Sequence, residues 1–218
     1  MLCLRAKWDR MVRSKTENRT RLRLLEAAEP LFASLGYDGV SLRTVAANAG
    51  AQLGAIPYHY GTKLALYRAI WEHWMPAISA DVLLRDLAVH PAMSLEEQIR
   101  RLVTAFLNGP RILLKSERGS YFAAILVREA NDPGRSDRTL LEEFIFPNGN
   151  LIRNELVRAM PGLSADRFDA GFKMTIGAIQ IAFENDKPRS DDHVEALFAA
   201  LTEFIVSGWL GLLRKKAA

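Results

Sequence analysis

The side chains best suited to catalysis are scattered along this sequence rather than grouped. The four histidines, His59, His73, His90 and His193, stand far apart, and none has a metal-ligand partner three or four residues away. The single cysteine, Cys3, has no neighbouring base to activate it. The sequence also lacks a phosphate-binding loop, a dinucleotide-binding fingerprint and a nucleophile elbow. These observations predict a protein that is not an enzyme and that uses no metal ion or cofactor.

Residues suited to non-covalent recognition gather instead between Ser41 and Lys63, in S-L-R-T-V-A-A-N-A-G-A-Q-L-G-A-I-P-Y-H-Y-G-T-K. Ser41 can cap a helix over residues 42–49, because its hydroxyl can accept a first-turn N–H. Gly50 can adopt the positive φ that ends this helix sharply. A second short helix is predicted over residues 52–60. Two short helices joined by a glycine-containing turn indicate a helix-turn-helix, whose second helix enters the major groove of DNA.

Polar and aromatic side chains are placed along this motif where they could touch a duplex. Arg43 and Thr44 lie in the first turn of its first helix and can face a phosphate strand. Lys63 begins a further helix, which Thr62 can cap, and it can reach another phosphate. Ile56 and Tyr60 are expected to anchor the second helix in the core. That helix should expose Gln52, Leu53, Ala55, Tyr58 and His59.

Positive charge is concentrated in the same part of the chain. Residues 1–63 contain ten Lys and Arg residues and five Asp and Glu residues, whereas residues 64–218 contain nineteen and twenty. This asymmetry is expected if only the N-terminal part meets phosphate. Residues 1–19 are polar and basic, which predicts a flexible arm that orders on DNA. Met11 offers a second candidate start, under which residues 1–10 would not belong to the protein.

A helix preceding the motif is predicted over residues 20–35. Leu24, Ala28, Leu31 and Leu35 recur at helical spacing and should face the core. Pro30 removes one backbone donor inside this pattern and predicts a kink. Gly36 is expected to end the helix.

Residues 20–74 resemble the DNA-binding domain of TetR-type transcriptional regulators. The resemblance rests on L-L-E-A-A-E-P-L-F-A-S-L-G-Y at residues 24–37, V-A-A-N-A-G at residues 45–50 and G-A-I-P-Y-H-Y-G-T-K at residues 54–63. It implies that Gly54, Tyr58, His59 and Lys63 contact DNA, mostly its backbone, with help from Arg43 and Thr44. Together with the residues expected to be exposed, the predicted DNA contacts are Arg43, Thr44, Gln52, Leu53, Gly54, Ala55, Tyr58, His59 and Lys63.

Two residues depart from the pattern of that family. Leu53 replaces a residue that is often polar or basic, so a contact with a thymine methyl is expected there rather than a hydrogen bond to a base. Pro57 replaces an aromatic or polar residue and stiffens the turn leading to Tyr58. Further along, F-A-A-I-L-V-R-E-A-N-D-P at residues 122–133 and E-E-F-I-F-P at residues 142–147 resemble the CecR-like subgroup.

The rest of the chain is helical in pattern, which predicts an all-α fold of about nine helices. We divide it into a basic arm over residues 1–19, a DNA-binding domain over 20–63, and a ligand-binding and dimerisation domain over 64–218. Helices are expected from residue 63 to about 90 with a bend at Pro76, over 94–107 ending at Asn108-Gly109-Pro110, over 116–130, and over 138–160 with an interruption at Pro147-Asn148-Gly149.

The last two predicted helices, residues 165–184 and 191–213, are apolar on more than one face. Met174, Ala178 and Ile181 form a second stripe on the first, and the second carries a wide stripe that includes Phe204 and Trp209. Such helices need cover on more than one side, so we expect a homodimer built as a four-helix interface. The alternative is a pair of core helices in a monomer. A dimer also suits a palindromic operator, which needs two recognition helices.

Aromatic and polar residues interleave on the helices that should surround a central cavity. A mostly apolar pocket with a few placed polar groups is the usual small-molecule site. Arg128 falls within an otherwise apolar helix and would suit an anionic or aromatic effector, although an aromatic stripe of this kind also fits plain core packing. The candidate ligand-binding residues are Trp74, Phe106, Tyr121, Phe122, Ile125, Arg128, Phe172 and Gln180.

These patterns, with the TetR resemblance, predict a homodimeric transcriptional repressor released from a palindromic operator by a small-molecule effector. An activator, a ligand-independent regulator and a helical small-molecule-binding protein with vestigial DNA binding are the alternatives. No run approaches about 18 consecutive apolar residues, so no membrane helix is predicted. A single cysteine fits a reducing compartment, so we expect the protein in the cytoplasm.

Overall fold

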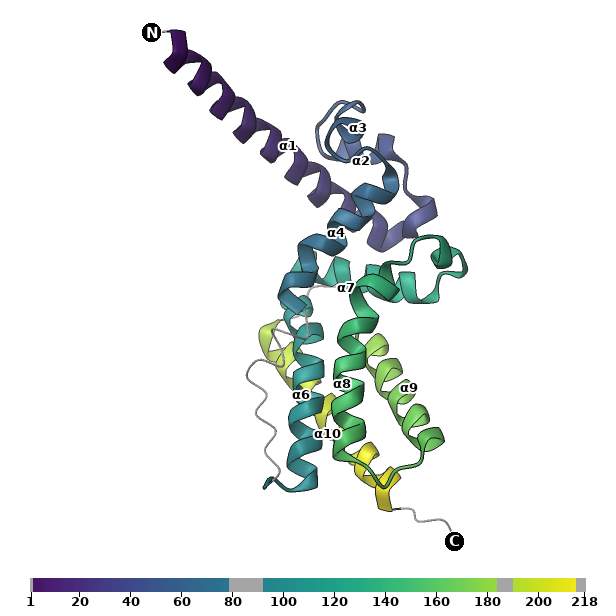
Figure 1. The fold of residues 1–218 in the computed structure, drawn as a ribbon. Coiled ribbons are helices and arrows are strands. Elements are labelled where there is room, and N and C mark those ends of the chain that lie inside the picture. The colour runs from purple at the N-terminus through teal and green to yellow at the C-terminus, as the bar shows by residue number, and fades with distance from the viewer. Residues whose placement is uncertain (1, 79–91, 184–189, 215–218) are drawn as a thin grey trace. The chain divides into compact units, whose positions relative to one another are not determined.

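The computed structural model describes residues 2–78, 92–183 and 190–214, with side chains from residue 18 onward except at Ser136 (Figure 1). These residues form nine α-helices, a short 3₁₀ helix and a π-helical segment, and they contain no β-strand, so the predicted all-α fold is confirmed. The elements are α1 (Leu2–Gly39), α2 (Leu42–Asn48), α3 (Ala55–His59), α4 (Lys63–Ile78), α6 (Leu95–Leu114), α7 (Glu117–Asn131), η1 (Pro133–Asp137), η2 (Leu141–Ile145), α8 (Phe146–Ala159), α9 (Ala165–Ala182) and α10 (Asp191–Arg214).

Contacts divide the chain into two compact units, Met1–Glu72 and His73–Ala218, and the division falls inside α4. The sequence placed the domain boundary at the start of this helix, after Lys63. Residues 2–19, expected to form a flexible arm, are helical, because α1 begins at Leu2. Residues 2–29 contain no Gly or Pro, so nothing in this stretch breaks a helix.

The helix α1 breaks at Gly36, whose φ of 71° and ψ of 177° lie outside the helical region. Glycine reaches such a φ without a steric penalty, so Gly36 ends the regular helix as predicted. The backbone stays helical at Pro30, and the expected kink is therefore found at Gly36 instead. Leu24, Ala28 and Phe32 are buried, but Leu35 next to the break is 53% exposed rather than part of the core.

The helices α2 and α3 pack against each other and against α1. Ser41 caps α2 as predicted, since its hydroxyl oxygen accepts the N–H of Thr44 at 3.1 Å. Gly50 ends the helix with a φ of 58°. Val45 and Ile56 are fully buried and hold the two helices in the N-terminal core. The helix-turn-helix predicted from the sequence is therefore present.

The helix α4 follows α3 through a turn at Gly61, and Thr62 caps it by accepting the N–H of Ala65 at 3.0 Å. Its N-terminal half closes the core of the first unit with an aromatic cluster. The ring of Tyr67 lies 4.7 Å from Phe32, 5.1 Å from Tyr37 and 6.2 Å from Trp71, measured between centroids. Tilted and edge-to-face pairs of this kind stabilise beyond the area they bury.

In the second unit α6 is the central helix, packing against α7, α8 and α10 (Figure 1). Its predicted capping box is present, because Ser94 and Glu97 exchange side-chain and backbone hydrogen bonds. The predicted stop at Asn108-Gly109-Pro110 is wrong, since α6 continues through Pro110 to Leu114. Leu113 and Leu114 beyond the proline are buried, and their burial offsets the cost of a proline in a helix, about 3 kcal/mol.

The segment after α7 is held by a buried ion-pair cluster. The guanidinium of Arg138, which is 6% exposed, contacts both carboxylate oxygens of Glu129, at 2.9 and 3.1 Å. Its other arm donates to Asp132 at 2.5 Å. The N–H of Gly134 and then Arg138 lower the pKa of the Asp132 carboxyl, because both favour its charged form. The cluster ties the end of α7 to both ends of η1.

The predicted interruption at Pro147-Asn148-Gly149 is also wrong. These residues lie in the first turn of α8, which begins at Phe146 and runs without a break to Ala159. Proline is compatible with a first turn, where its missing N–H would have no partner within the helix. The irregularity comes earlier, as the π-helical turn η2.

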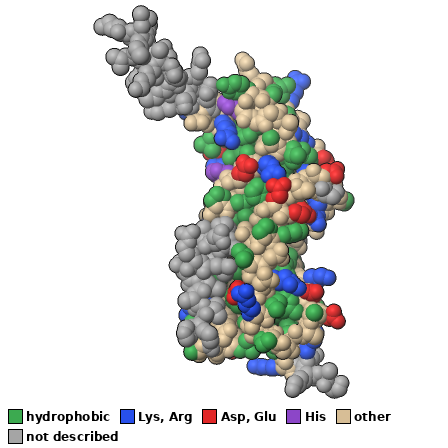
Figure 2. All heavy atoms as spheres, viewed as in Figure 1, with side chains coloured by type: hydrophobic (Ala, Val, Ile, Leu, Met, Phe, Trp, Pro, Cys, Tyr) green, Lys and Arg blue, Asp and Glu red, His purple; other side chains and the backbone are tan. Residues whose placement is uncertain are grey.

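The helices α9 and α10 pack against each other with boundaries close to those predicted. By length and composition alone α10 could cross a membrane. This is weak evidence, since core helices of soluble proteins meet the same criterion. Across the face drawn in Figure 2, Lys and Arg side chains are interspersed with Asp and Glu side chains rather than gathered into one patch.

Candidate functional site

The first turn of α2 presents Arg43 and Thr44 to solvent. Ser41 fixes this turn, and its hydroxyl oxygen lies 2.8 Å from that of Thr44. A glutamate at the position of Thr44 would complete a capping box, so the threonine leaves the turn without a negative charge. A turn that carries an arginine and no acidic residue suits contact with phosphate.

The helix α3 is shorter than predicted and begins at Ala55 rather than Gln52. Gln52, Leu53 and Gly54 therefore lie in the turn before it, and all three are exposed. Pro57 is the third residue of α3, where a backbone N–H has no partner within the helix, so it is accommodated. This turn and the first turn of α3 together carry the side chains expected to reach the bases.

Two large side chains of this segment, Leu53 and Tyr58, lie at the surface of the domain. Leu53 is 52% exposed and Tyr58 is 69% exposed, whereas Ile56 between them is fully buried. The rings of Tyr58 and His59 meet edge to face, with centroids 4.9 Å apart. Ile56 thus fixes α3 in the domain, whereas Leu53 and Tyr58 lie at its surface.

Lys63 at the start of α4 makes contacts that sequence reasoning missed. Its Nζ donates to the backbone oxygen of Asp38 at 3.3 Å and lies 4.7 Å from the centre of the Tyr37 ring. These contacts tie α4 to the turn before α2. They involve residues 25 positions apart, so no local spacing in the sequence indicates them.

Two arginines counted with the basic N-terminal stretch also hold the motif together. Arg23 donates to the backbone oxygen of Gly50 at 3.1 Å. The Tyr60 hydroxyl donates to the backbone oxygen of Arg21 at 2.7 Å, and the Arg21 guanidinium lies 5.3 Å from the Tyr60 ring centre. Burial raises the pKa of the Tyr60 hydroxyl, so it remains a donor at neutral pH. Tyr60 therefore anchors α3 to α1, as expected.

The second unit contains a cavity of about 310 Å³. Of the predicted ligand-binding residues, Phe106, Phe172 and Gln180 line it. The rings of Phe106 and Phe172 are stacked with centroids 6.1 Å apart. The lining residues are Met75, Ile78, Phe106, Pro110, Leu113, Leu126, Val127, Ala130, Leu141, Ile145, Phe146, Asn148, Gly149, Asn150, Ile152, Phe172, Ile176, Ile179, Gln180 and Phe183.

The other five predicted ligand-binding residues do not line this cavity. Phe122 and Ile125 are fully buried and belong to the packed core, and the partly buried Trp74 stacks on Phe122 with centroids 6.0 Å apart. The Tyr121 hydroxyl donates to Glu117 at 2.6 Å, and Arg128 is exposed. The residues of α7 that line the cavity are Leu126, Val127 and Ala130, which the prediction did not include.

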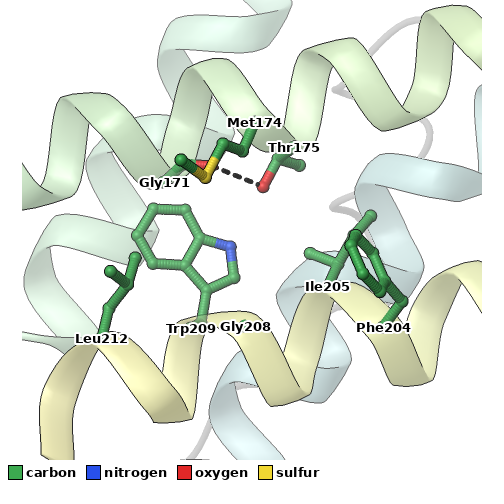
Figure 3. A pocket seen from close by; sticks show the side chains of 8 residues that line it. All are labelled: Gly171, Met174, Thr175, Phe204, Ile205, Gly208, Trp209 and Leu212. Carbon is green, nitrogen blue, oxygen red and sulfur yellow. Dashed lines mark hydrogen bonds between the residues drawn. The ribbon is translucent and has the colours of Figure 1, made fainter.

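A groove runs between α9 and α10 on the surface of the second unit (Figure 3). Figure 3 shows the indole of Trp209 directed from α10 toward Gly171 in α9, beside the hydrogen bond from Thr175 to the Gly171 oxygen, which measures 2.9 Å. Three large apolar side chains on these helices are exposed, namely Met174 at 68%, Ile181 at 67% and Phe204 at 69%. Exposed apolar side chains on two packed helices are typical of an interaction face.

Two family models match the chain, one in each unit. Residues 24–70 match "Bacterial regulatory proteins, tetR family", which covers α2, α3 and most of the contacts described above. Residues 104–208 match "Tetracyclin repressor-like, C-terminal domain". The chain has both domains of the TetR family. The resemblance to the CecR-like subgroup is not supported, because the C-terminal match is to a different description.

Solved structures of TetR-family proteins share this fold. A TetR-like regulator from a Rhodococcus species is 20% identical, with 90% of this chain and 97% of that chain covered and a TM-score of 0.60. PfmR from Thermus thermophilus is 17% identical, with 85% and 98% covered and a TM-score of 0.60. FadR from Bacillus subtilis, solved with stearoyl-CoA, is 16% identical, with 86% and 98% covered and a TM-score of 0.60. No curated protein sequence matched this chain.

In this TetR-family chain the approach of α9 to α10 depends on Gly171. A Cβ at this position would lie 2.7 Å from Leu212 Cδ1 and 2.9 Å from Trp209 Cζ3. Leu212 could rotate, but the Trp209 ring is buried and has little room to move. Gly171→Ala should therefore lower the free energy of unfolding by about 1–3 kcal/mol, measured by urea denaturation.

The matched control is Gly177→Ala on the same helix, where a Cβ would meet nothing within 4 Å. Because alanine favours helix over glycine, this variant should be as stable as the parent or more stable by about 0.5–1 kcal/mol. Equal losses in the two variants would contradict the assignment of Gly171 as a close-packing residue.

Proposed function

We propose that this TetR-family chain is a homodimeric transcriptional repressor that a small-molecule effector releases from a palindromic operator. The observation that carries the proposal is the exposure of Leu53 and Tyr58 on either side of the fully buried Ile56. A short helix that is anchored by a buried side chain and that, with the turn before it, exposes large side chains fits insertion into a groove of DNA, in a domain matching a family of bacterial regulators.

The proposed contacts divide into two kinds. Arg43, Thr44, Gly54, Tyr58, His59 and Lys63 would hold the phosphate backbone and set the position of the motif. Gln52, Leu53 and Ala55 would face base edges, where an amide can pair with adenine and an apolar side chain can contact a thymine methyl. To reach a phosphate, Lys63 would exchange its contacts with Asp38 and Tyr37 for a stronger, charge-assisted bond.

The cavity of the second unit is the proposed effector site, through Phe106, Phe172 and Gln180 among its walls. Its apolar lining with a few polar groups is typical of small-molecule sites. FadR from Bacillus subtilis was solved with stearoyl-CoA, which shows that a protein of this fold can hold an apolar chain. An effector would act allosterically only if it bound the DNA-competent and released states with different affinities.

The proposed dimer forms through α9 and α10, and it would act in the cytoplasm on double-stranded DNA. Met174, Ile181 and Phe204 would be buried against a second copy, which removes apolar surface from water. A two-fold axis would then place the helix-turn-helix motif of each copy on one half of a palindrome.

Band-shift titrations with DNA from upstream of the gene should show a complex that weakens as salt rises. Tyr58→Ala should lower affinity for every sequence by roughly tenfold to a hundredfold, the effect of losing a hydrogen bond to a charged group. Gln52→Ala should instead change preference at one base-pair position, by about 1–3 kcal/mol.

Tyr121→Ala is the matched control, since it removes a partly exposed tyrosine from the second unit. It should leave DNA binding unchanged. The proposal fails if no upstream fragment gives a salt-sensitive complex, or if Tyr58→Ala and Tyr121→Ala behave alike. Deletion of the gene should raise transcription of its targets, whereas lower transcription would identify an activator.

A further inference from the structure

The walls of the cavity in the second unit differ from those expected for a charged ligand. Among the lining residues that the structure describes, none carries a charged side chain. Three side chains supply polar groups, and all three are carboxamides, those of Asn148, Asn150 and Gln180. The remaining lining positions are apolar side chains and one glycine.

An ion held against the described walls would lose hydration without gaining a counter-charge from them. Burial of an isolated charge is strongly unfavourable unless an opposite charge or several hydrogen bonds compensate it. Arg128, the residue that suited an anionic effector, is exposed and does not line the cavity. The described walls therefore favour a neutral ligand over a carboxylate, a phosphate or an ammonium ion.

Gln180 is the side chain best placed to orient such a ligand. It lies on α9 among Phe172, Ile176, Ile179 and Phe183, which also line the cavity. Its carboxamide makes no hydrogen bond with any described residue, whereas that of Asn148 already donates to the Phe144 oxygen at 3.1 Å. A carboxamide can both donate and accept, so it can pair with an alcohol, ketone or amide.

The size and surface of the cavity limit the rest of the ligand. Its volume of about 310 Å³ lies at the low end for ligand pockets. The stacked pair of Phe106 and Phe172, with Phe146 and Phe183, offers flat aromatic faces. These walls suit a compact hydrocarbon or aromatic body.

We propose that the ligand of this cavity is a compact, uncharged and largely apolar molecule whose single polar group is held by Gln180. This inference rests on the proposed function of the cavity as the effector site. It names the chemical class of the effector and the residue that selects it.

The test compares two fluorescent probes that share one skeleton, N-phenylnaphthylamine and its sulfonate, anilinonaphthalene sulfonate. Both are titrated into the full-length protein in the absence of DNA. The neutral probe should bind at least about tenfold more tightly, because only the sulfonate must be buried as an ion. Equal or tighter binding of the sulfonate would overturn the proposal.

The location of binding is tested with two glycine variants. Gly149 lines the cavity and a Cβ there would meet nothing within 4 Å, so Gly149→Phe can narrow the cavity without a clash at Cβ. Gly162→Phe places the same side chain at an exposed glycine whose surroundings are equally open. Gly149→Phe should weaken the neutral probe about tenfold or more and Gly162→Phe should not. Equal binding to both variants would overturn the proposed site.

The role of Gln180 is tested by displacing the neutral probe with octanamide or octanoate. The parent should prefer octanamide. Gln180→Leu should weaken octanamide about tenfold, and Gln180→Lys should shift the preference toward octanoate by supplying a counter-charge. Retained preference for octanamide in the lysine variant would overturn the assignment of Gln180.

These measurements are separate from those that test the repressor. If the neutral probe binds in the cavity but no ligand of this class releases DNA, the ligand chemistry stands and the proposed effector role fails. If charged ligands bind in the cavity and release DNA, the proposed function stands and the inference of a neutral ligand is wrong.

Discussion

Phe204→Glu is expected to convert the dimer proposed here into a monomer. Phe204 is 69% exposed on α10 and lines the groove together with Trp209 and Gly171. In a two-fold interface the substitution would introduce two carboxylates, one from each copy, into surface that must lose water. Burying an unpaired charge costs far more than the apolar contact that is lost. Sedimentation equilibrium of the parent and the variant measures the change directly.

The same variant should bind its operator roughly a hundredfold more weakly or worse, because a monomer loses the second, effectively intramolecular contact with the palindrome. Its affinity for a single half-site should stay unchanged, since α3 is untouched. This comparison distinguishes loss of the dimer from damage to the helix-turn-helix.

Ala199→Glu provides the control on the same helix. Ala199 is exposed, and its position five residues earlier turns it about 140° around the helix axis from Phe204. This variant should remain dimeric. A parent that sediments as a monomer, or a Phe204→Glu variant that stays dimeric, would contradict the proposed interface.

The largest effect on stability is expected for Arg138→Leu. Arg138 is 6% exposed and Glu129 is 1% exposed, and the guanidinium contacts both carboxylate oxygens. Removing one partner leaves the other charge buried, which costs about 3–5 kcal/mol. Urea denaturation followed by circular dichroism gives the loss in the free energy of unfolding.

Two further variants identify the cause of that loss. The double variant Glu129→Leu with Arg138→Leu removes both charges and should recover much of the stability, because a well-packed apolar pair can replace a buried ion pair. Arg158→Leu breaks an exposed pair with Glu155, in which Arg158 is 75% exposed, and should cost less than about 1 kcal/mol. Equal losses for Arg138→Leu and Arg158→Leu would contradict the importance of burial.

The cluster also predicts a response to acid. The pKa of Asp132 is lowered in the folded protein, so its bonds to Gly134 and Arg138 stabilise the fold above the pKa of an unfolded aspartate. That contribution is lost as the pH falls through the lower, folded-state pKa. Asp132→Asn should therefore flatten the decline of stability at acidic pH.

Patterns of neighbouring residues in the sequence predicted most of the helices and the helix-turn-helix. The caps at Ser41, Thr62 and Ser94 were predictable because each hydrogen bond joins residues three positions apart. Gly50 was predictable because few other residues tolerate its φ of 58°. The interruptions predicted at Pro110 and Pro147 are absent. The burial of Leu113 and Leu114 offsets the cost of Pro110 inside α6, and Pro147 lies in the first turn of α8, where a proline is tolerated.

The cavity shows the limit of reasoning from spacing. A pattern of apolar residues shows that α7 is buried, but more than one face of α7 meets a neighbour. Phe122 and Ile125 are buried in the core, whereas Leu126 and Val127 line the cavity. Only the arrangement of α6, α8 and α9, which line the cavity together with α7, decides which residues of α7 border it.

The segment from Ser41 to Lys63 shows which features depend on the local sequence and which depend on the tertiary structure. The sequence by itself determined that this segment is a capped helix, a glycine turn and a second helix, because those features depend on neighbouring residues. Tertiary structure alone decided that Tyr60, Arg23 and Lys63 donate to backbone oxygens within the domain. Such contacts join residues far apart in the chain, and only the folded arrangement brings them within hydrogen-bond distance.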